Sequence, residues 1–254
     1  MKITQAFLLG VIQGIAEFLP ISSSGHLVLL QNWLQIYPVP FLFDIILHFS
    51  TSLAVIYFFR KRILNLNKDE IIKLGIGSIP IFVIGYLFED KISDLFALEL
   101  AAGVGLLVTS IFNFIAANKF AKNIKSEQKK MSSKDALIIG LWQTVALIPG
   151  ISRSGSTLTG AALIKQRKKK AFEFSFLLSI PAILAANFYQ LITAESSSLN
   201  NLVEPYFIIG IIAAFVTGVA SLKILEKVIK SKKYVFFAWY CLFLGSFVIL
   251  KQVF

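Results

Sequence analysis

Gln13-Gly-Ile-Ala-Glu17-Phe-Leu-Pro-Ile-Ser-Ser-Ser-Gly-His26 interrupts an apolar stretch that runs from Ile3 to Leu30. A proline followed by serines and a glycine breaks a helix, so the stretch divides into two half-helices around a polar turn. Irregular backbone at membrane depth is tolerated only where protein or a water-filled cavity surrounds it. We therefore predict a re-entrant hairpin over residues 3–30; the alternative is a kinked full span.

A second apolar stretch, from Asp135 to Ile164, is interrupted in the same way by Pro149-Gly-Ile-Ser-Arg-Ser-Gly-Ser156. Residues 10–25 placed over 140–155 agree at seven of 16 positions without a gap. This predicts two repeats, over 1–118 and 135–254, joined by a basic cytoplasmic linker over 119–134. Each repeat would hold one hairpin, over 3–30 or 135–164, and three spans. Because three is odd, the second repeat would insert upside down, as in many transporters.

The composition excludes several classes of protein. The chain has 254 residues, of which 56% are hydrophobic and 15% charged, with a mean hydropathy of +0.75. Soluble domains carry roughly 25% charged residues, so a soluble globule is excluded. One cysteine and two histidines exclude a disulfide scaffold, a four-cysteine zinc site and a histidine-rich metal centre. The net charge of +11 indicates basic cytoplasmic loops, and no nucleic-acid partner is expected.

Six further stretches approach the roughly 20 apolar residues that a transmembrane helix needs. They are Phe41–Phe59, Ile71–Phe88, Ala97–Asn118, Ala171–Ile192, Pro205–Leu225 and Tyr234–Leu250. The sequence therefore predicts an all-α integral membrane protein with six transmembrane helices and two re-entrant hairpins. Its surroundings would be membrane lipids, and an oligomer is compatible with the sequence.

The basic residues predict how the chain is oriented. Segments 60–70, 119–134, 165–170 and 226–233 hold 19 of the 25 Lys and Arg residues, whereas the opposite set of loops holds only Lys91. Because Lys and Arg concentrate in cytoplasmic loops, these four segments are predicted to be cytoplasmic and both termini extracytoplasmic. Two of the basic segments flank the second interrupted stretch, which must therefore leave and return on one side, as a hairpin does.

Hydroxyl, carboxylate and guanidinium groups gather at the two turns. They are Glu17, Ser22, Ser23, Ser24 and His26 at the first turn, and Ser152, Arg153, Ser154, Ser156 and Thr157 at the second. The donor fork of Arg153 and a helix N-terminus suit a phosphate group. Glu17 in such a cradle would need a bridging metal, or would orient a catalytic group. The alternative is a structural Glu17–Arg153 pair that holds the hairpin tips together, with serines capping helices.

The two histidines have different expected roles. His26 follows the serines directly and could act as a base, a general acid or a nucleophile on phosphorus, or it could only be hydrogen-bonded. His48 follows Asp44 by four residues. We interpret that pair as interfacial packing with a capping carboxylate.

The stretch from Gln13 to His26 resembles the first motif of the undecaprenyl-diphosphate phosphatases of the bacitracin-resistance type. Pro149–Thr157 resembles their second motif, and Phe174–Pro181 is also similar to that family. The resemblance covers essentially the whole chain. It implies an enzyme of the bacterial plasma membrane that removes the terminal phosphate of undecaprenyl diphosphate, a polyprenyl lipid, and so recycles the carrier for peptidoglycan synthesis.

The resemblance also implies roles for individual residues. Glu17 would be the essential carboxylate, His26 the essential histidine, and Arg153 the diphosphate-binding arginine. Ser23 would be the nucleophile or a phosphate ligand. The substrate-binding positions would be Gln13, Ser22, Ser24, Gly25, Ser152, Ser154 and Thr157. The family has Glu or Gln at position 13, and Gln13 cannot act as a base.

A divalent metal, Mg²⁺ or Ca²⁺, is implied by the resemblance, with Glu17 as a ligand, although the sequence shows no dedicated cage for it. Ser23, His26 and water remain open as the attacking group. The inverted repeat also suggests a transporter or flippase for a lipid phosphate or small anion. A purely structural scaffold would leave the matched polar turns unexplained.

Overall fold

The computed structural model describes residues 1–36, 39, 41–88, 91–92, 95, 98–122, 130–193 and 204–253. Within these residues the regular structure is helical and contains no strand. The prediction of an all-α protein is therefore confirmed.

Six helices among the described residues are long and apolar enough to cross a membrane. They are α3 (Phe41–Ile63), α4 (Lys68–Leu87), α6 (Glu99–Lys122), α9 (Lys168–Thr193), α11 (Pro205–Lys230) and α12 (Val235–Val253). Each overlaps one predicted span. Helix α3 continues past the predicted end at Phe59, because cations in a last turn interact favourably with the helix dipole and Arg60, Lys61 and Arg62 supply them.

The two interrupted stretches each fold as two helices around a turn, as predicted. The first forms α1 (Ile3–Phe18) and α2 (Ser23–Trp33), and the second forms α7 (Ser133–Thr144) and α8 (Arg153–Leu163). In each stretch the two helices contact one another. Their re-entrant course through a membrane stays a prediction.

Local chemistry explains where these helices stop and start. Helix α1 ends just before Pro20, as helices do before proline. The Ser22 hydroxyl accepts a hydrogen bond from the Gly25 N–H at 3.3 Å, and the Ser152 hydroxyl accepts one from the Gly155 N–H at 3.1 Å. Both serines therefore cap a helix N-terminus. Gly150 has a φ of +83°, which glycine adopts without strain.

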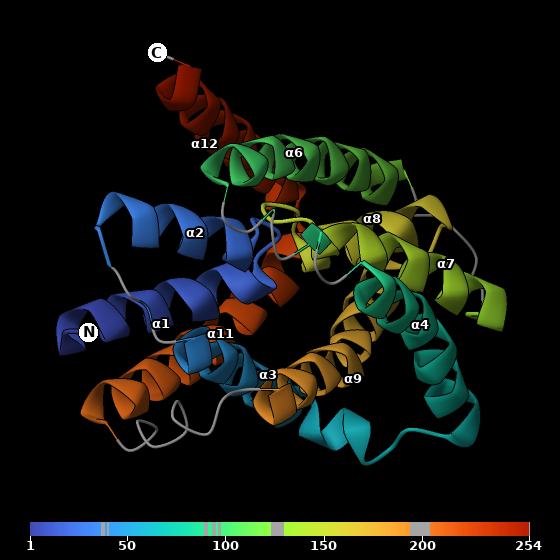
Figure 1. The fold of residues 1–254 in the computed structure, drawn as a ribbon. Helices are drawn as coiled ribbons and strands as arrows, with labels where there is room; N and C mark the ends of the chain where they lie inside the picture. The colour runs from blue at the N-terminus through green and yellow to red at the C-terminus, as the bar shows by residue number, and fades with distance from the viewer. Residues whose placement is uncertain are drawn as a thin grey trace.

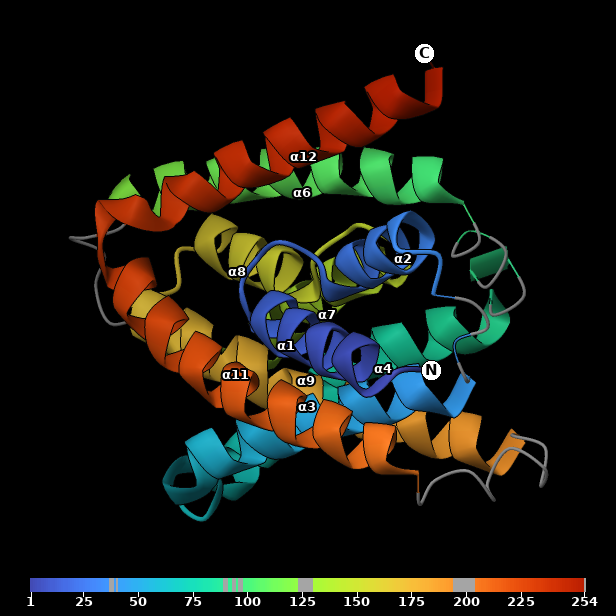
Figure 2. The same ribbon diagram turned by 90° about the vertical axis from the view of Figure 1, so that its left-hand side faces the viewer.

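The hairpin helices lie between two groups of longer helices (Figures 1 and 2). Helices α6 and α12 lie side by side at the top of both views, and α3, α9 and α11 form the lower part. In Figure 1, α1 and α2 reach the centre from the left, and α7 and α8 reach it from the right. The two turns therefore meet inside the protein.

Equivalent helix contacts occur in the two predicted repeats, since α7 and α4 are the counterparts of α1 and α11. Helix α1 packs along α11 and α7 packs along α4, and α6 also contacts α12. Glycine makes these approaches close. A methyl group at Gly10 would lie 3.0 Å from the Ala213 Cβ, and one at Gly140 would lie 3.0 Å from the Gly77 Cα. Gly10 and Gly140 are matched positions of the sequence repeat, whose inverted insertion stays a prediction.

Helix α6 fastens both turns. The Asn113 amide donates to the Pro20 carbonyl at 2.6 Å, and the Thr109 hydroxyl donates to the Gly150 carbonyl at 2.8 Å. The turns also touch directly, since a Cβ at Gly25 would lie 3.0 Å from the Gly150 Cα. These buried hydrogen bonds hold the two polar turns next to each other.

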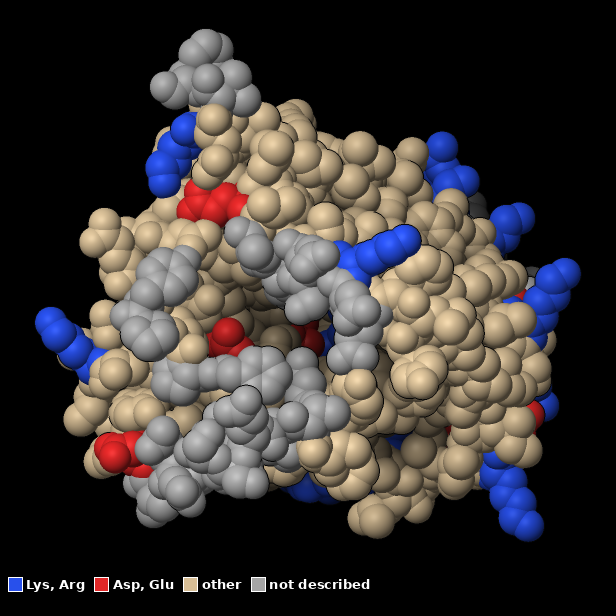
Figure 3. Space-filling view, viewed as in Figure 1, with Lys and Arg blue, Asp and Glu red and all other residues tan. Residues whose placement is uncertain are grey.

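Both termini lie on the left of Figure 1, opposite the start of α7. Figure 3 shows several Lys and Arg side chains along the right-hand edge, and others at the left-hand edge and near the centre. The orientation of the chain stays a prediction. The linker residues 123–129, and with them Lys129, lie outside the described residues, as does Ser197.

Thiol labelling tests the predicted orientation. In a Cys241→Ala background, Lys129→Cys and Lys168→Cys should react with an impermeant reagent only after the membrane is opened. Ser197→Cys should react in intact cells, because few cations mark its side of the membrane. Reaction of Lys168→Cys from outside would refute the second hairpin.

Candidate active site

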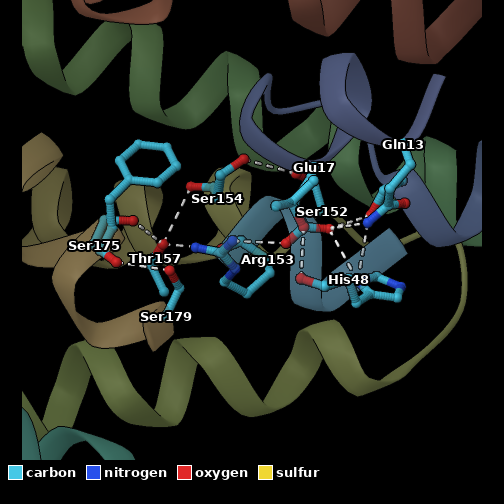
Figure 4. Close-up of polar contacts among 12 residues, drawn as sticks. Gln13, Glu17, His48, Ser152, Arg153, Ser154, Thr157, Ser175 and Ser179 are labelled. Carbon is cyan, nitrogen blue, oxygen red and sulfur yellow. Dashed lines mark hydrogen bonds and ion pairs between the residues drawn. The ribbon is translucent and has the colours of Figure 1, made fainter. Parts of the chain in front are cut away.

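Glu17 is the point at which the two motifs join (Figure 4). Its Oε1 accepts a hydrogen bond from the Arg153 guanidinium at 2.8 Å, and its Oε2 accepts one from the Ser23 hydroxyl at 2.6 Å. The side chains of Glu17 and Arg153 are only 6% and 13% exposed. The buried Glu17 carboxylate thus pairs with Arg153 of the second hairpin and accepts a hydrogen bond from Ser23 of its own hairpin.

The contact between Ser23 and Glu17 has the form of an activated nucleophile. A serine hydroxyl is a weak nucleophile until an adjacent base accepts its proton. Glu17 Oε2 lies within hydrogen-bond distance of that proton. The repeat alignment places Ser23 opposite Arg153. The two halves therefore supply different groups, a hydroxyl and a cation, to the same carboxylate.

Arg153 has N–H donors that do not bond to Glu17. Its NH1 group is buried and has no hydrogen-bond partner among the described residues. The guanidinium carbon lies 5.6 Å from the centre of the Phe176 ring, whose face attracts the cation. A buried donor without a partner is costly, so an anion that accepts from it would be bound favourably.

The other predicted binding residues form the frame of the site. The Ser22 and Ser152 hydroxyls cap α2 and α8, and they also contact the Ser24 and Ser154 hydroxyls at 3.2 and 3.1 Å. The Gly25 N–H is bonded to Ser22. Thr157 donates to the Arg153 carbonyl at 2.9 Å and contacts Ser175 of α9. These contacts fix the backbone from which Ser23 and Arg153 project.

His26 lies away from the Glu17 contacts. Its Nδ1 is 2.7 Å from the Ser22 carbonyl oxygen and its Nε2 is 2.7 Å from the Tyr240 hydroxyl. The two rings are stacked with centres 5.6 Å apart. Because a carbonyl only accepts, Nδ1 must carry the proton, and Nε2 of the neutral ring accepts from Tyr240. In this structure His26 ties α2 to α12.

His48 is a site residue that the sequence reasoning missed. Its Nδ1 lies 3.0 Å from Gln13 Nε2 and 3.5 Å from Glu17 Oε2. The interpretation of His48 as interfacial packing is therefore wrong. Asp44 accepts from the Gln31 amide at 3.1 Å. The sequence did indicate a role for His48, because it lies inside a predicted span, where ionisable residues are usually functional.

The residues at the junction suit a metal ion only together with substrate. No three His, Cys, Asp or Glu side chains of the described residues are close enough to form a metal site. Glu17 supplies a carboxylate, whereas the Gln13 carbonyl oxygen, which lacks a partner among the described residues, faces away from it. Mg²⁺ is often held by one or two carboxylates plus substrate phosphates. Glu17 therefore fits a cation whose other ligands are phosphate oxygens.

A separate cavity of about 260 Å³ lies where α3 ends and α4 and α9 begin. It contains no residue of the two motifs. Of its acidic residues, Glu70 and Glu173 pair with Arg62, and Asp69 pairs with Lys73. The polar junction lies elsewhere.

Comparison with known proteins places the chain in a family. The family described as "Bacitracin resistance protein BacA" matches residues 6–247. A protein named undecaprenyl-diphosphatase from Halothermothrix orenii is 39% identical over 98% of this chain and 98% of its own length. Proteins of the same name from Methanococcus vannielii and Protochlamydia amoebophila are 37% and 39% identical, each over at least 95% of both chains. The chain therefore belongs to the BacA family of bacitracin resistance proteins.

Proposed function

We propose that this protein is a membrane phosphatase that hydrolyses undecaprenyl diphosphate to undecaprenyl phosphate and inorganic phosphate, and so recycles the lipid carrier. The relatives named undecaprenyl-diphosphatase support this substrate. The observation that carries the proposal is the Ser23–Glu17–Arg153 arrangement, in which a base, a hydroxyl and a cation meet. The transporter alternative is not favoured by these comparisons.

Arg153 would bind the terminal phosphate. Its guanidinium donates to Glu17 through NH2 and has NH1 left to donate to a phosphate oxygen. Charge that develops on the reacting phosphate would be stabilised by a donor already in place, in a site from which water is largely excluded. The isoprenoid tail would lie against apolar helix faces and lipid.

Ser23 would attack the terminal phosphorus. A bond forms between Ser23 Oγ and phosphorus as the bond from phosphorus to the bridging oxygen breaks, and undecaprenyl phosphate leaves with the electron pair. The serine proton passes to Glu17, which lies 2.6 Å away. Water then cleaves the phosphoserine, Ser23 recovers the proton held by Glu17, and inorganic phosphate leaves with the water oxygen.

A divalent cation, Mg²⁺ or Ca²⁺, is part of the proposal. Glu17 would hold it together with the diphosphate, and when bound it would neutralise charge on the substrate. We also propose a multi-pass protein of the bacterial plasma membrane, with the two hairpins re-entrant, the repeats inverted and both termini extracytoplasmic. The equivalent contacts of α1 with α11 and of α7 with α4 support the repeat.

Product analysis tests the proposed reaction. Purified protein in detergent should convert undecaprenyl diphosphate to equal amounts of undecaprenyl phosphate and inorganic phosphate. A chelator should stop the reaction and added Mg²⁺ or Ca²⁺ should restore it. Transfer of intact undecaprenyl diphosphate across a vesicle membrane without phosphate release would instead identify a transporter.

Arg153→Lys should be severely impaired although the charge is kept. A lysine cannot hold Glu17 and also present a forked pair of donors to phosphate. The expected loss is about 2–3 kcal/mol of transition-state stabilisation, or roughly 30–160-fold in rate. Arg60→Lys, at an exposed arginine that donates to the Tyr57 carbonyl, is the matched control. Full activity of Arg153→Lys would remove Arg153 from the site.

A further inference from the structure

His48 reaches the junction from α3, a helix that belongs to neither motif. Its Nδ1 lies 3.0 Å from Gln13 Nε2, and the same amide nitrogen lies 3.3 Å from Glu17 Oε2. Gln13 is fully buried, and the His48 side chain is 32% exposed. The Gln13 amide therefore contacts both the Glu17 carboxylate and the His48 ring, and His48 Nδ1 itself lies 3.5 Å from Glu17 Oε2.

The hydrogen atoms of this contact can be assigned from chemistry. A carboxylate only accepts, so the Gln13 amide must turn its NH₂ group toward Glu17. The second hydrogen of that group then points to His48 Nδ1, which must accept it with a lone pair. The ring proton consequently sits on Nε2. The Gln13 carbonyl oxygen is left facing away from Glu17, and it has no partner among the described residues.

We infer that His48 is a positioning residue, which holds the Gln13 amide and through it the Glu17 carboxylate in the orientation that Ser23 needs. This inference rests on the proposed phosphatase activity. Arg153 secures Oε1 of Glu17, whereas Oε2, the atom that takes the serine proton, is secured on its other side by Gln13. Without His48, the Gln13 amide has one contact instead of two and holds Oε2 less firmly.

Three substitutions at His48 test whether the hydrogen-bond acceptor at the Nδ1 position, and not another property of the ring, supports catalysis. His48→Asn places Oδ1 near the position of Nδ1 and keeps an acceptor for Gln13. His48→Phe keeps a ring but has no acceptor. His48→Gln places its amide near Nε2 instead. We expect kcat to fall about three- to tenfold in the Phe and Gln variants, as for one lost neutral hydrogen bond, with KM within twofold. The Asn variant should recover most of kcat.

A double-mutant cycle tests whether His48 acts through Gln13. In a Gln13→Ala background, His48→Phe should cause no further loss, because the contact it removes is already absent. An equal loss of kcat in both backgrounds would overturn the inference. So would a rise in KM at constant kcat, which would make His48 a direct ligand of the substrate.

Ser52→Ala is the matched control on α3, since the Ser52 hydroxyl bonds only to the Phe49 carbonyl of its own helix among the contacts of the described residues. It should leave kcat and KM unchanged, and detergent melting curves should show all variants folded. If the wild type and Ser52→Ala release phosphate and the three His48 variants match them, only the role of His48 fails. If the wild type itself releases no phosphate from undecaprenyl diphosphate, the proposed function fails.

Discussion

Glu17→Gln is expected to lose phosphate release by about 10²–10⁴-fold, the range for removal of a general base. The amide keeps the size of the side chain but can take no proton from Ser23 and carries no charge opposite Arg153. Both oxygens of Glu17 are engaged in the present structure, one by each motif. The measurement is the initial rate of phosphate release at several Mg²⁺ or Ca²⁺ concentrations, alongside a detergent melting curve.

Substitutions at Gln13 provide the comparison for Glu17, one helical turn away on the same face. Gln13→Ala should keep partial activity, because Gln13 supports the carboxylate without taking a proton. Gln13→Glu should remain active, since the added carboxylate would share the divalent cation with Glu17 and the phosphates. Glu226→Gln, at an exposed pair with Lys230, controls for charge removal elsewhere.

Two outcomes would move Glu17 out of its assigned role. Near-normal turnover of Glu17→Gln would show that the catalytic carboxylate lies elsewhere. An inactive variant that also melts far below the wild type would make Glu17 the structural partner of Arg153, because a buried cation without its partner is strongly destabilising.

Local sequence patterns were enough to predict the helices and the two turns. Hydropathy located the six long helices, and proline, serine and glycine located the turns with their serine caps. The repeat showed that the two turns are counterparts. A contact between Glu17 and Arg153 was expected because a carboxylate and a cation in an apolar interior need partners. These features depend on residues close together in the chain or on charge alone.

Contacts that depend on how distant helices pack could not be predicted. His48 meets Gln13 only because α3 packs beside α1, and nothing in the first motif refers to residue 48. His26 stands next to the serines in sequence, yet its ring turns to Tyr240, 214 positions away. A helix face is set by rotation about its axis, which sequence spacing alone leaves undetermined for a helix surrounded by protein and lipid.

Ser23→Ala is expected to have the largest effect of any substitution in the site. It removes the atom proposed to form the bond to phosphorus, and the hydroxyl is the closest ligand of Glu17 Oε2. Loss of a nucleophile that acts together with its base costs at least about 10³-fold. Ser52→Ala, on α3, removes only a contact with the Phe49 carbonyl of its own helix among the described residues. It should leave the rate unchanged.

The measurement that tests the central claim most directly is phosphate release from undecaprenyl diphosphate by wild type, Ser23→Ala and Ser52→Ala at equal concentrations of folded protein. The account predicts rapid release by the wild type and by Ser52→Ala, and at least about 10³-fold slower release by Ser23→Ala. Equal rates for Ser23→Ala and the wild type would contradict it, as would a wild-type rate no higher than that without protein.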